Sequence, residues 1–338
     1  MDNLALWQIT LDDYIISAAW SAQDDTVFIG TGSGKLYAVE VQSGRILYEI
    51  TAHKIGLLSL AYSQQSQLVA TGGQDGFCNF YDAKTGKLLH QHSFGRAWVE
   101  HLQTAPDGYH FLAGGGKSIM LFDAKGQLLW QYDDHKNTVA HIDWAKNSRV
   151  FITSNYGTIH IFDVMRDTPT ETLQYPTSLI SLKWSPNLRF IAAGTQDAKI
   201  HFWELPYEPQ TDLEMSGYPS KVKTLSWSAD SVYLASNCDN HIIIWNASGA
   251  GPAGTQPIQV RRHVGKVTQL AYRKTRNELL SGGEDALVVL WQPSHSKSPL
   301  YVGMTSAEVS CLAWSRNDQK ALIGTAQGDV EIWDFSVL

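Results

Sequence analysis

Cysteine is scarce in this chain, and its spacing excludes two common kinds of small-domain framework. The three cysteines among 338 residues are Cys78, Cys238 and Cys311. An odd number at these separations fits neither a disulfide framework nor a zinc knuckle. We therefore expect reduced, buried thiols, which favour a cytoplasmic protein because disulfides persist in oxidising compartments.

Long apolar runs and positive charge are also lacking. No apolar segment approaches the length of a membrane span, and the start Met1-Asp2-Asn3 lacks a signal-peptide layout, so we expect no membrane partner. Lys and Arg number 26 against 33 Asp and Glu, which gives a net charge of −7. This balance argues against nucleic-acid partners, because those require a basic surface. No stretch keeps helical periodicity over three turns.

What the chain does have is one pattern stated eight times. An aromatic-plus-acidic pair, or a close variant, occurs at Val39-Glu40, Tyr81-Asp82, Phe122-Asp123, Phe162-Asp163, Trp203-Glu204, Trp245-Asn246, Trp291-Gln292 and Trp333-Asp334. A second landmark, here called position zero, falls at Trp20, Tyr62, Thr104, Trp144, Trp184, Trp227, Tyr272 and Trp314. The residues five and two places before it are apolar in every unit. A fixed period near forty residues indicates a repeat architecture.

Each unit contains four short strands separated by turn residues. In the second unit, turns at 63–66, 72–76 and 83–86 are rich in Ser, Gly and Asp and separate four strand-like runs between Leu57 and His92. Four strands in about forty residues make one propeller blade.

The order of strands, the Gly-x-Asp turn and the closing Trp-Asp resemble the WD-repeat β-propellers over essentially the whole chain. The resemblance implies a hydrogen-bonded tetrad of His, Ser or Thr, Asp and Trp within a blade. Unit seven carries His263, Ser281, Asp285 and Trp291, and unit two carries His53, Thr71, Asp75 and Tyr81. We interpret both tetrads as structural, because buried polar groups need partners.

The repeat predicts an all-β fold in which residues 1–338 form a single eight-bladed β-propeller of four-stranded antiparallel blades. The last unit ends four residues after Asp334, so it lacks a fourth strand of its own. Leu4–Thr10 precedes the first unit and is similar to the outer strand at Leu128–Tyr132. We therefore expect residues 1–11 to supply the outer strand of the last blade and to close the ring, which removes an exposed sheet edge.

The function predicted from these features is a non-enzymatic protein-interaction scaffold, a platform within a complex. No catalytic arrangement stands out above the repeat, so we expect no catalytic residue. The glycine clusters at 30–35 and 114–118 are each followed by a strand, whereas a phosphate loop needs a helix there, so no cofactor is expected. Fold alone does not identify the partner, and the oligomeric state stays open.

Basic residues gather in the turns that enter units six and seven. They are Lys221, Lys223, Arg261, Arg262 and Lys266. The aromatics Trp98, Tyr175 and Tyr218 are candidates for exposed contacts on the same face of the ring. Acidic or phosphorylated segments of a protein or peptide partner suit such a cluster. The alternatives are ordinary solvated turns, or contacts through the long connection Ala247–Pro257 on the opposite face.

A second hypothesis is an enzyme or metal-binding propeller that uses the central channel. His101 and His141 occupy the same place in adjacent units, and Glu100 and Asp143 lie beside them in the sequence. A metal would need three or four converging ligands. Flanking serines are poor zinc ligands, so ordinary hydrogen-bonded histidines and no bound metal are favoured.

Overall fold

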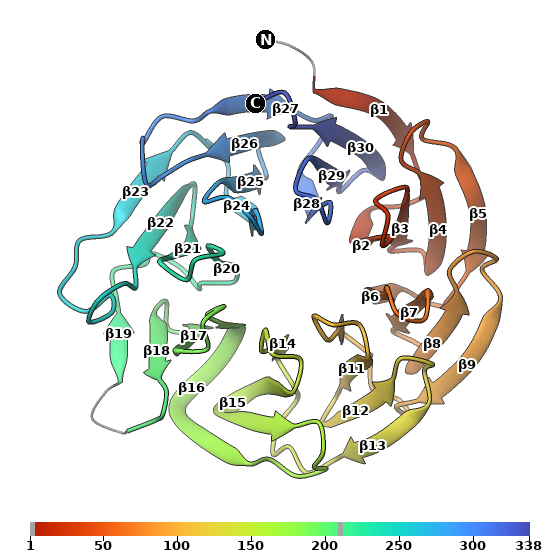
Figure 1. The fold of residues 1–338 in the computed structure, drawn as a ribbon, viewed down its shortest axis with the longest axis horizontal. Coiled ribbons are helices and arrows are strands. Elements are labelled where there is room, and N and C mark those ends of the chain that lie inside the picture. The colour runs from red at the N-terminus through yellow and green to blue at the C-terminus, as the bar shows by residue number, and fades with distance from the viewer. Residues whose placement is uncertain (1–3, 209–211) are drawn as a thin grey trace.

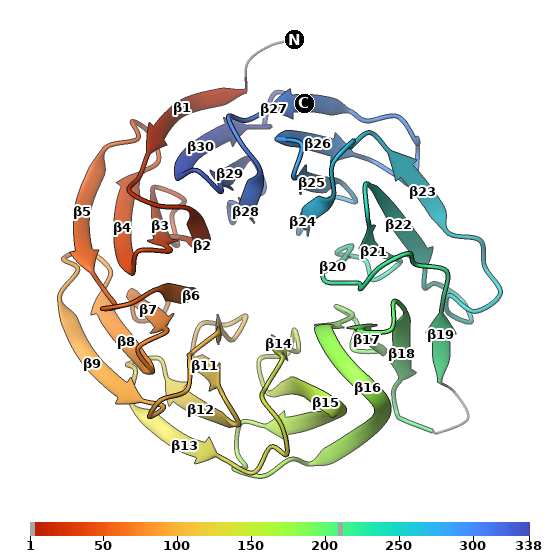
Figure 2. The ribbon, with the colours of Figure 1, turned by 180° about the vertical axis from the view of Figure 1, so that it is seen from behind.

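The computed structural model describes residues 4–208 and 212–338. The strands form a ring of sheets around a central axis, and the view from behind shows the same arrangement (Figures 1 and 2). In each sheet the first strand of the unit lies near the axis and the last strand lies at the rim (Figure 1). Within these ranges, no helical segment has the length and apolar character needed to span a bilayer.

Units one to three form separate four-stranded antiparallel sheets. Unit one contains β2 (Ile15–Trp20), β3 (Thr26–Thr31), β4 (Lys35–Glu40) and β5 (Ile46–Thr51). Unit two contains β6 (Leu57–Ser63), β7 (Leu68–Gly73), β8 (Phe77–Asp82) and β9 (Leu88–Ser93). Unit three contains β10 (His101–Thr104), β11 (His110–Gly115), β12 (Ser118–Asp123) and β13 (Leu128–Tyr132).

The remaining units complete the ring. Units four and five contain β14 (His141–Trp144), β15 (Val150–Asp163), β16 (Glu171–Trp184), β17 (Phe190–Thr195), β18 (Ile200–Glu204) and β19 (Leu213–Met215). Unit six contains β20 (Leu225–Trp227), β21 (Tyr233–Cys238), β22 (His241–Asn246) and β23 (Ile258–Arg261). Unit seven contains β24 (Val267–Tyr272), β25 (Leu279–Gly283), β26 (Leu287–Trp291) and β27 (Tyr301–Met304). Unit eight contains β28 (Val309–Trp314), β29 (Lys320–Thr325) and β30 (Asp329–Asp334), joined by β1 (Ala5–Thr10).

Burial within a sheet follows the position of each strand in the ring. The third strand β26 has the sequence LVVLW and is buried along its whole length, because neighbouring sheets cover both of its faces. The outer strand β5 instead alternates between exposed and partly buried residues from Leu47 onward. This period of two is expected for a strand with one face in water.

The fourth and fifth units differ from the prediction, because they share one six-stranded sheet in the order β14 to β19. If each hydrogen-bonded sheet is counted as one blade, the described residues form seven blades. The prediction of eight separate blades is therefore wrong. β15 folds back on itself, since the rings of Phe151 and Phe162 stack with centroids 5.2 Å apart. β16 then pairs with β15 through its first half and with β17 through its second half.

The continuity of β16 has a local cause in the sequence. Pro176 disfavours helical backbone at Tyr175, so the chain stays extended where other units turn across the face. Unit six also has a Tyr-Pro pair at this place, Tyr218-Pro219, but Gly217 precedes it with φ +98°, and β19 ends just before, at Met215. Unit five has Gln174 instead of that glycine, and its strand continues.

Packing between units keeps the repeat that the sequence displays. Each buried hydrophobic cluster combines residues of two consecutive units. The cluster between units eight and one is built in the same way, with Ile29 from unit one and with Leu322 and Val330 from unit eight. All three side chains are fully buried.

The strand β1 lies at the rim of the last sheet and pairs antiparallel with β30. Ala5 stands opposite Trp333, and Thr10 stands opposite Asp329. Trp7 and Ile9 point inward and pack against the cluster shared by units one and eight. The Trp7 indole also donates a hydrogen bond to the Val41 carbonyl of unit one at 2.6 Å. β1 therefore contacts both of the units that meet at this point of the ring.

Deleting residues 1–11 should lower the free energy of unfolding by several kcal/mol, because the deletion exposes the edge of β30 and removes apolar contacts. Chemical denaturation measures this directly. Leu6→Ser is the matched control, since its side chain is 47% exposed and the variant should stay close to wild type, unlike Ile9→Ser. A truncated chain with unchanged melting temperature would refute a stabilising role for β1.

Candidate functional site

One face of the ring carries the fourth-to-first and second-to-third strand turns, and we call it the top face. A cleft of about 420 Å³ lies there between units six and seven. Its lining includes three of the predicted basic residues, Lys221, Lys223 and Lys266. Arg261 and Arg262 are exposed at the end of β23 and just after it, so all five predicted basic residues face solvent in one sector.

Hydrogen bonds from the sheets fix the two loops that carry these cations. The Asn237 side chain accepts from the backbone N–H groups of Lys223 and Thr224, both at 3.0 Å. In unit seven, the Asp285 carboxylate accepts from the Val264 N–H at 2.7 Å. The cleft therefore has rigid walls, because loop backbone is bonded to side chains on strands and tight turns.

Two acidic residues also line the cleft and were not predicted as part of the site. They are Asp239 and Glu284, both exposed. The Lys266 ammonium lies 3.9 Å from a Glu284 carboxylate oxygen, a long and solvent-exposed ion pair that contributes little energy. Among the described residues, Lys221, Lys223, Arg261 and Arg262 form no ion pair within 4.0 Å, so four of the cations remain available to a ligand.

The three predicted aromatic contacts do not gather at this cleft. Trp98 is 51% exposed, as expected, but it precedes β10 in unit three and does not line the cleft. Tyr175 and Tyr218 are only 8% exposed, so the expectation that they are surface contacts is wrong.

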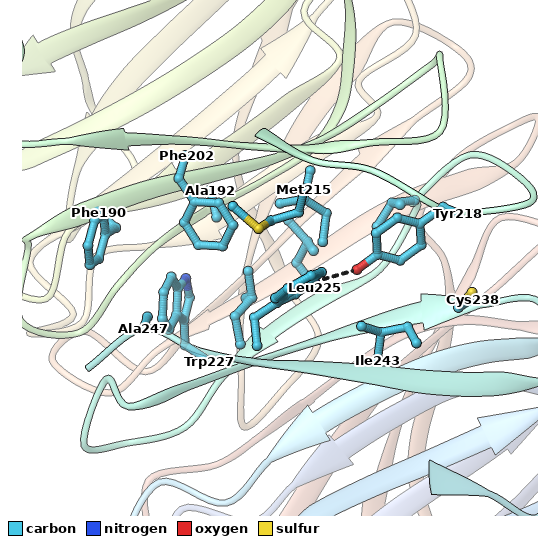
Figure 3. Packing of buried hydrophobic residues seen from close by; sticks show 14 residues of the cluster. Phe190, Ala192, Phe202, Met215, Tyr218, Leu225, Trp227, Cys238, Ile243 and Ala247 are labelled. Carbon is cyan, nitrogen blue, oxygen red and sulfur yellow. Dashed lines mark hydrogen bonds between the residues drawn. The ribbon is translucent and has the colours of Figure 1, made fainter. Parts of the chain in front are cut away.

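Tyr218 is buried because it takes the place of the tetrad histidine in unit six. Its hydroxyl lies 2.7 Å from Ser236 Oγ and accepts a hydrogen bond from the Trp245 indole at 2.8 Å. Figure 3 shows Tyr218 within the cluster shared by units five and six, with the hydroxyl bond drawn as a dashed line. Its separation of 18 residues from Ser236 equals that of His263 from Ser281, and this spacing was the available signal.

Tyr175 occupies the corresponding place in unit five. Its ring lies against His201, with centroids 4.6 Å apart, and its hydroxyl donates to a Glu214 carboxylate oxygen at 3.1 Å. Burial raises the pKa of Tyr175, and the bond to Glu214 raises it further. The residue is thus part of the interior of unit five.

In unit seven the structure brings the four tetrad residues together in one chain of hydrogen bonds. The Trp291 indole donates to Ser281 Oγ at 2.9 Å, Ser281 Oγ lies 2.8 Å from His263 Nε2, and His263 Nδ1 lies 3.0 Å from Asp285. Burial alone would raise the pKa of Asp285, but bonds from His263 and the Val264 amide hold it below its ordinary value. The chain runs from the core to the turn that carries Lys266.

Unit two contains a shorter version of this arrangement. His53 lies 2.8 Å from both Asp75 and Thr71. The Tyr81 hydroxyl donates to the Ala52 carbonyl at 3.1 Å. Unit four keeps the histidine and lacks the aspartate. His135 Nε2 lies 2.8 Å from Thr153 Oγ1, and His135 Nδ1 lies 3.0 Å from the Lys117 carbonyl oxygen, which takes the place of the carboxylate.

The channel residues His101 and His141 do lie side by side, with ring centroids 5.9 Å apart. Burial lowers the pKa of His101 to about 4 and holds that of His141 well below its ordinary value. His101 Nε2 lies 3.2 Å from the Val139 carbonyl oxygen, and Glu100 is exposed at the end of the preceding loop. In residues 4–208 and 212–338, no group of three or more His, Cys, Asp or Glu is placed to hold a metal ion.

Asp143 is already paired, which was not predicted. Its carboxylate accepts from the Lys183 ammonium at 2.6 Å and from the Trp184 amide at 2.9 Å. Burial raises the pKa of Asp143, and Lys183 only partly offsets the rise. Asp143 and Lys183 both precede position zero by one residue in consecutive units, so the repeat register could have revealed this pair.

Comparisons with known proteins agree on a repeat architecture. The chain matches the family model described as outer membrane protein assembly factor BamB over residues 4–250. It is 25% identical over 236 residues to Protein FIZZY-RELATED 1 of Arabidopsis thaliana, covering 67% of this chain and 48% of that protein. It is 27% identical over 235 residues to the B-type cell cycle switch protein ccs52B of Medicago truncatula, covering 67% and 47%.

A longer match is with the WD repeat-containing protein slp1 of Schizosaccharomyces pombe, at 21% identity over 316 residues, which cover 89% of this chain and 55% of that protein. The chain thus spans about half the length of the curated relatives it matches. Among solved structures, the computationally designed Ika8 protein superposes with a TM-score of 0.81 at 19% identity, covering 96% of this chain and 97% of that one. At that identity the likeness concerns the fold alone.

Asp285→Ala should destabilise the protein by roughly 1–3 kcal/mol, because buried His263 and the Val264 amide lose their acceptor. The matched control is Asp197→Ala in unit five, where the side chain is 43% exposed and no tetrad histidine stands opposite. That variant should stay within about 0.5 kcal/mol of wild type. Urea denaturation measures the free energy of unfolding of both variants. If the two variants are equally stable, the interpretation of the tetrad as structural is contradicted.

His135 should make stability fall as the solution is acidified below pH 6.5. Burial, and to a smaller extent the neighbouring His160, lower the pKa of His135 from 6.5 to about 4. Between these two pH values the unfolded chain binds a proton at His135 and the folded chain does not. The loss should reach up to roughly 1.4 kcal/mol for each pH unit. Denaturation of wild type and His135→Gln between pH 7 and 4.5 tests this, and parallel curves would contradict it.

Proposed function

This chain is a WD-repeat β-propeller that belongs to the family described as outer membrane protein assembly factor BamB, and we propose that it is a non-enzymatic scaffold for a protein or peptide partner. The observation that carries the proposal is the basic cleft between units six and seven. It combines a defined hollow of about 420 Å³ with three lysines in its lining and two arginines beside it.

The partner that fits this cleft carries acidic or phosphorylated groups. Four of the five cations have no counterion within 4.0 Å among the described residues, in a protein whose net charge is −7. Opposite charge would steer such a segment toward the cleft and would lose effect as salt is added. Asp239 and Glu284 would add selectivity, because they repel anions that are placed on the wrong side of the lysines.

The names of the relatives support a regulatory setting for the scaffold. The Medicago truncatula relative is a cell cycle switch protein by name, and the family description names an assembly factor. Both descriptions suit a rigid platform that acts through its contacts with other proteins. We propose a cytoplasmic location as well, which is supported by three cysteines that are free and buried in different units.

Reversing two charges, with Lys223→Glu and Arg262→Glu in one variant, should slow association with the partner by at least about tenfold at low salt. The partner is first recovered by affinity purification with the wild-type chain and identified by mass spectrometry. Association rates are then measured for both proteins at 50 and 500 mM salt, where the difference should shrink.

The matched control deletes part of the connection 247–257 on the opposite face, where Gly249 and Gly254 have no neighbour that a side chain would meet. This deletion should leave the association rate unchanged. If binding survives the charge reversal and fails after the loop deletion, the top-face cleft is not the site.

A further inference from the structure

A second hollow lies on the opposite face, which carries the first-to-second strand turns and which we call the bottom face. This cavity of about 390 Å³ is lined by the position-zero aromatics of four consecutive units, Trp144, Trp184, Trp227 and Tyr272. Each of them ends a first strand, β14, β16, β20 or β24, and these strands lie nearest the axis (Figure 1). A cavity bordered by all four must therefore lie at the mouth of the central channel.

Cations stand two residues beyond position zero at this mouth. Lys146 and Lys274 line the aromatic cavity, and Lys274 also lines an adjoining cavity of about 320 Å³ together with Arg316. The residues at this place in the eight units are Ala22, Gln64, Pro106, Lys146, Pro186, Ala229, Lys274 and Arg316. The set contains three positive charges and no negative charge.

These three cations have no close counterion. Among the described residues, Lys146, Lys274 and Arg316 form no ion pair within 4.0 Å. Two acids that attract Lys274 also accept backbone hydrogen bonds: Asp24 accepts from the Arg316 amide at 2.8 Å, and Asp318 accepts from the Thr275 amide at 2.7 Å. Burial lowers the pKa of Lys274, and the attraction of Asp318 offsets this only in part. An anion at the mouth would supply the missing partner.

The position-zero aromatics that line this cavity lack side-chain hydrogen bonds that Trp20 and Trp314, at the same place in other units, do form. The indoles of Trp20 and Trp314 donate to carbonyls of the preceding unit, Ala313 and Ala271, both at 2.9 Å. The indole nitrogens of Trp144, Trp184 and Trp227 and the Tyr272 hydroxyl have no partner among the described residues, although all four side chains are more than nine-tenths buried. The same arc of four units therefore carries both the cavity and the unsatisfied polar groups, which is unusual for a native interior.

We propose that the bottom mouth of the channel binds a small organic anion that combines a flat apolar ring with a negatively charged group. The ring would lie against the wall formed by Trp184, Trp227 and Tyr272, and the charged group would meet Lys146 and Lys274. The volume falls within the range of small-molecule sites, which pair mostly apolar walls with a few placed polar groups. This ligand would bind on the face opposite the protein partner proposed above.

The test uses the chain of 338 residues and the fluorescent probe 8-anilinonaphthalene-1-sulfonate. This probe is suitable because it joins flat aromatic rings to one negatively charged sulfonate. We expect saturable binding of one probe per chain, and Lys274→Gln or Lys146→Gln should each weaken it about tenfold. N-phenyl-1-naphthylamine, which lacks the sulfonate, should bind at least about tenfold more weakly to wild type and should not distinguish the variants.

The matched control is Lys221→Gln, which removes a lysine from the top-face cleft and should bind the probe as wild type does. Thermal denaturation of each variant verifies that the fold is retained. The proposal is overturned if the probe fails to saturate, if both bottom-face variants bind like wild type, or if Lys221→Gln loses binding equally. Because no protein partner takes part, these outcomes are independent of the fate of the scaffold proposal.

Discussion

The structure depends on one constraint: a sheet in this ring has two apolar faces, and only its neighbours can cover them. Every buried cluster draws its residues from two consecutive units, including the pair formed by units eight and one. A strand such as β26 is entirely apolar for this reason, and it would be insoluble outside the ring. Contacts between neighbouring units therefore stabilise the whole ring. The turns on the two faces lie outside these contacts and can carry different charges.

The two faces use that freedom in different ways. On the top face, lysines and arginines stand on loops held by Asn237 and Asp285, beside two exposed carboxylates. On the bottom face, the aromatic residues that cap the first strands form a wall, and Lys146 and Lys274 stand at its border. The first arrangement suits a charged segment of a large partner, and the second suits a small flat ligand, because only the second is lined by aromatic side chains.

Periodicity predicted the strands well, because the residues that recur every forty positions are those buried between neighbours. It failed where a substitution changes the local backbone or the hydrogen-bond chemistry. Pro176 without a preceding glycine lets β16 run through two units and merges two sheets. Tyr218 was predicted as an exposed aromatic contact, yet its hydroxyl takes the place of a histidine nitrogen against Ser236. The pairing of Asp143 with Lys183 joins the same repeat position of two adjacent units, so it could have been found by aligning the units with one another.

The pairing of β1 with β30 has a consequence for the time course of folding. Thr10 and Asp329, which are joined by a side-chain hydrogen bond, are 319 residues apart in the chain. During synthesis β1 emerges before the other strands of the ring, and its partner β30 emerges after all of them. Until β30 emerges, the edge of β1 has no partner strand, and Trp7 and Ile9 lack the unit-eight residues of their cluster, so this segment is prone to aggregation in that interval. The sheet of unit eight can therefore be completed only after every other strand of the ring has been made.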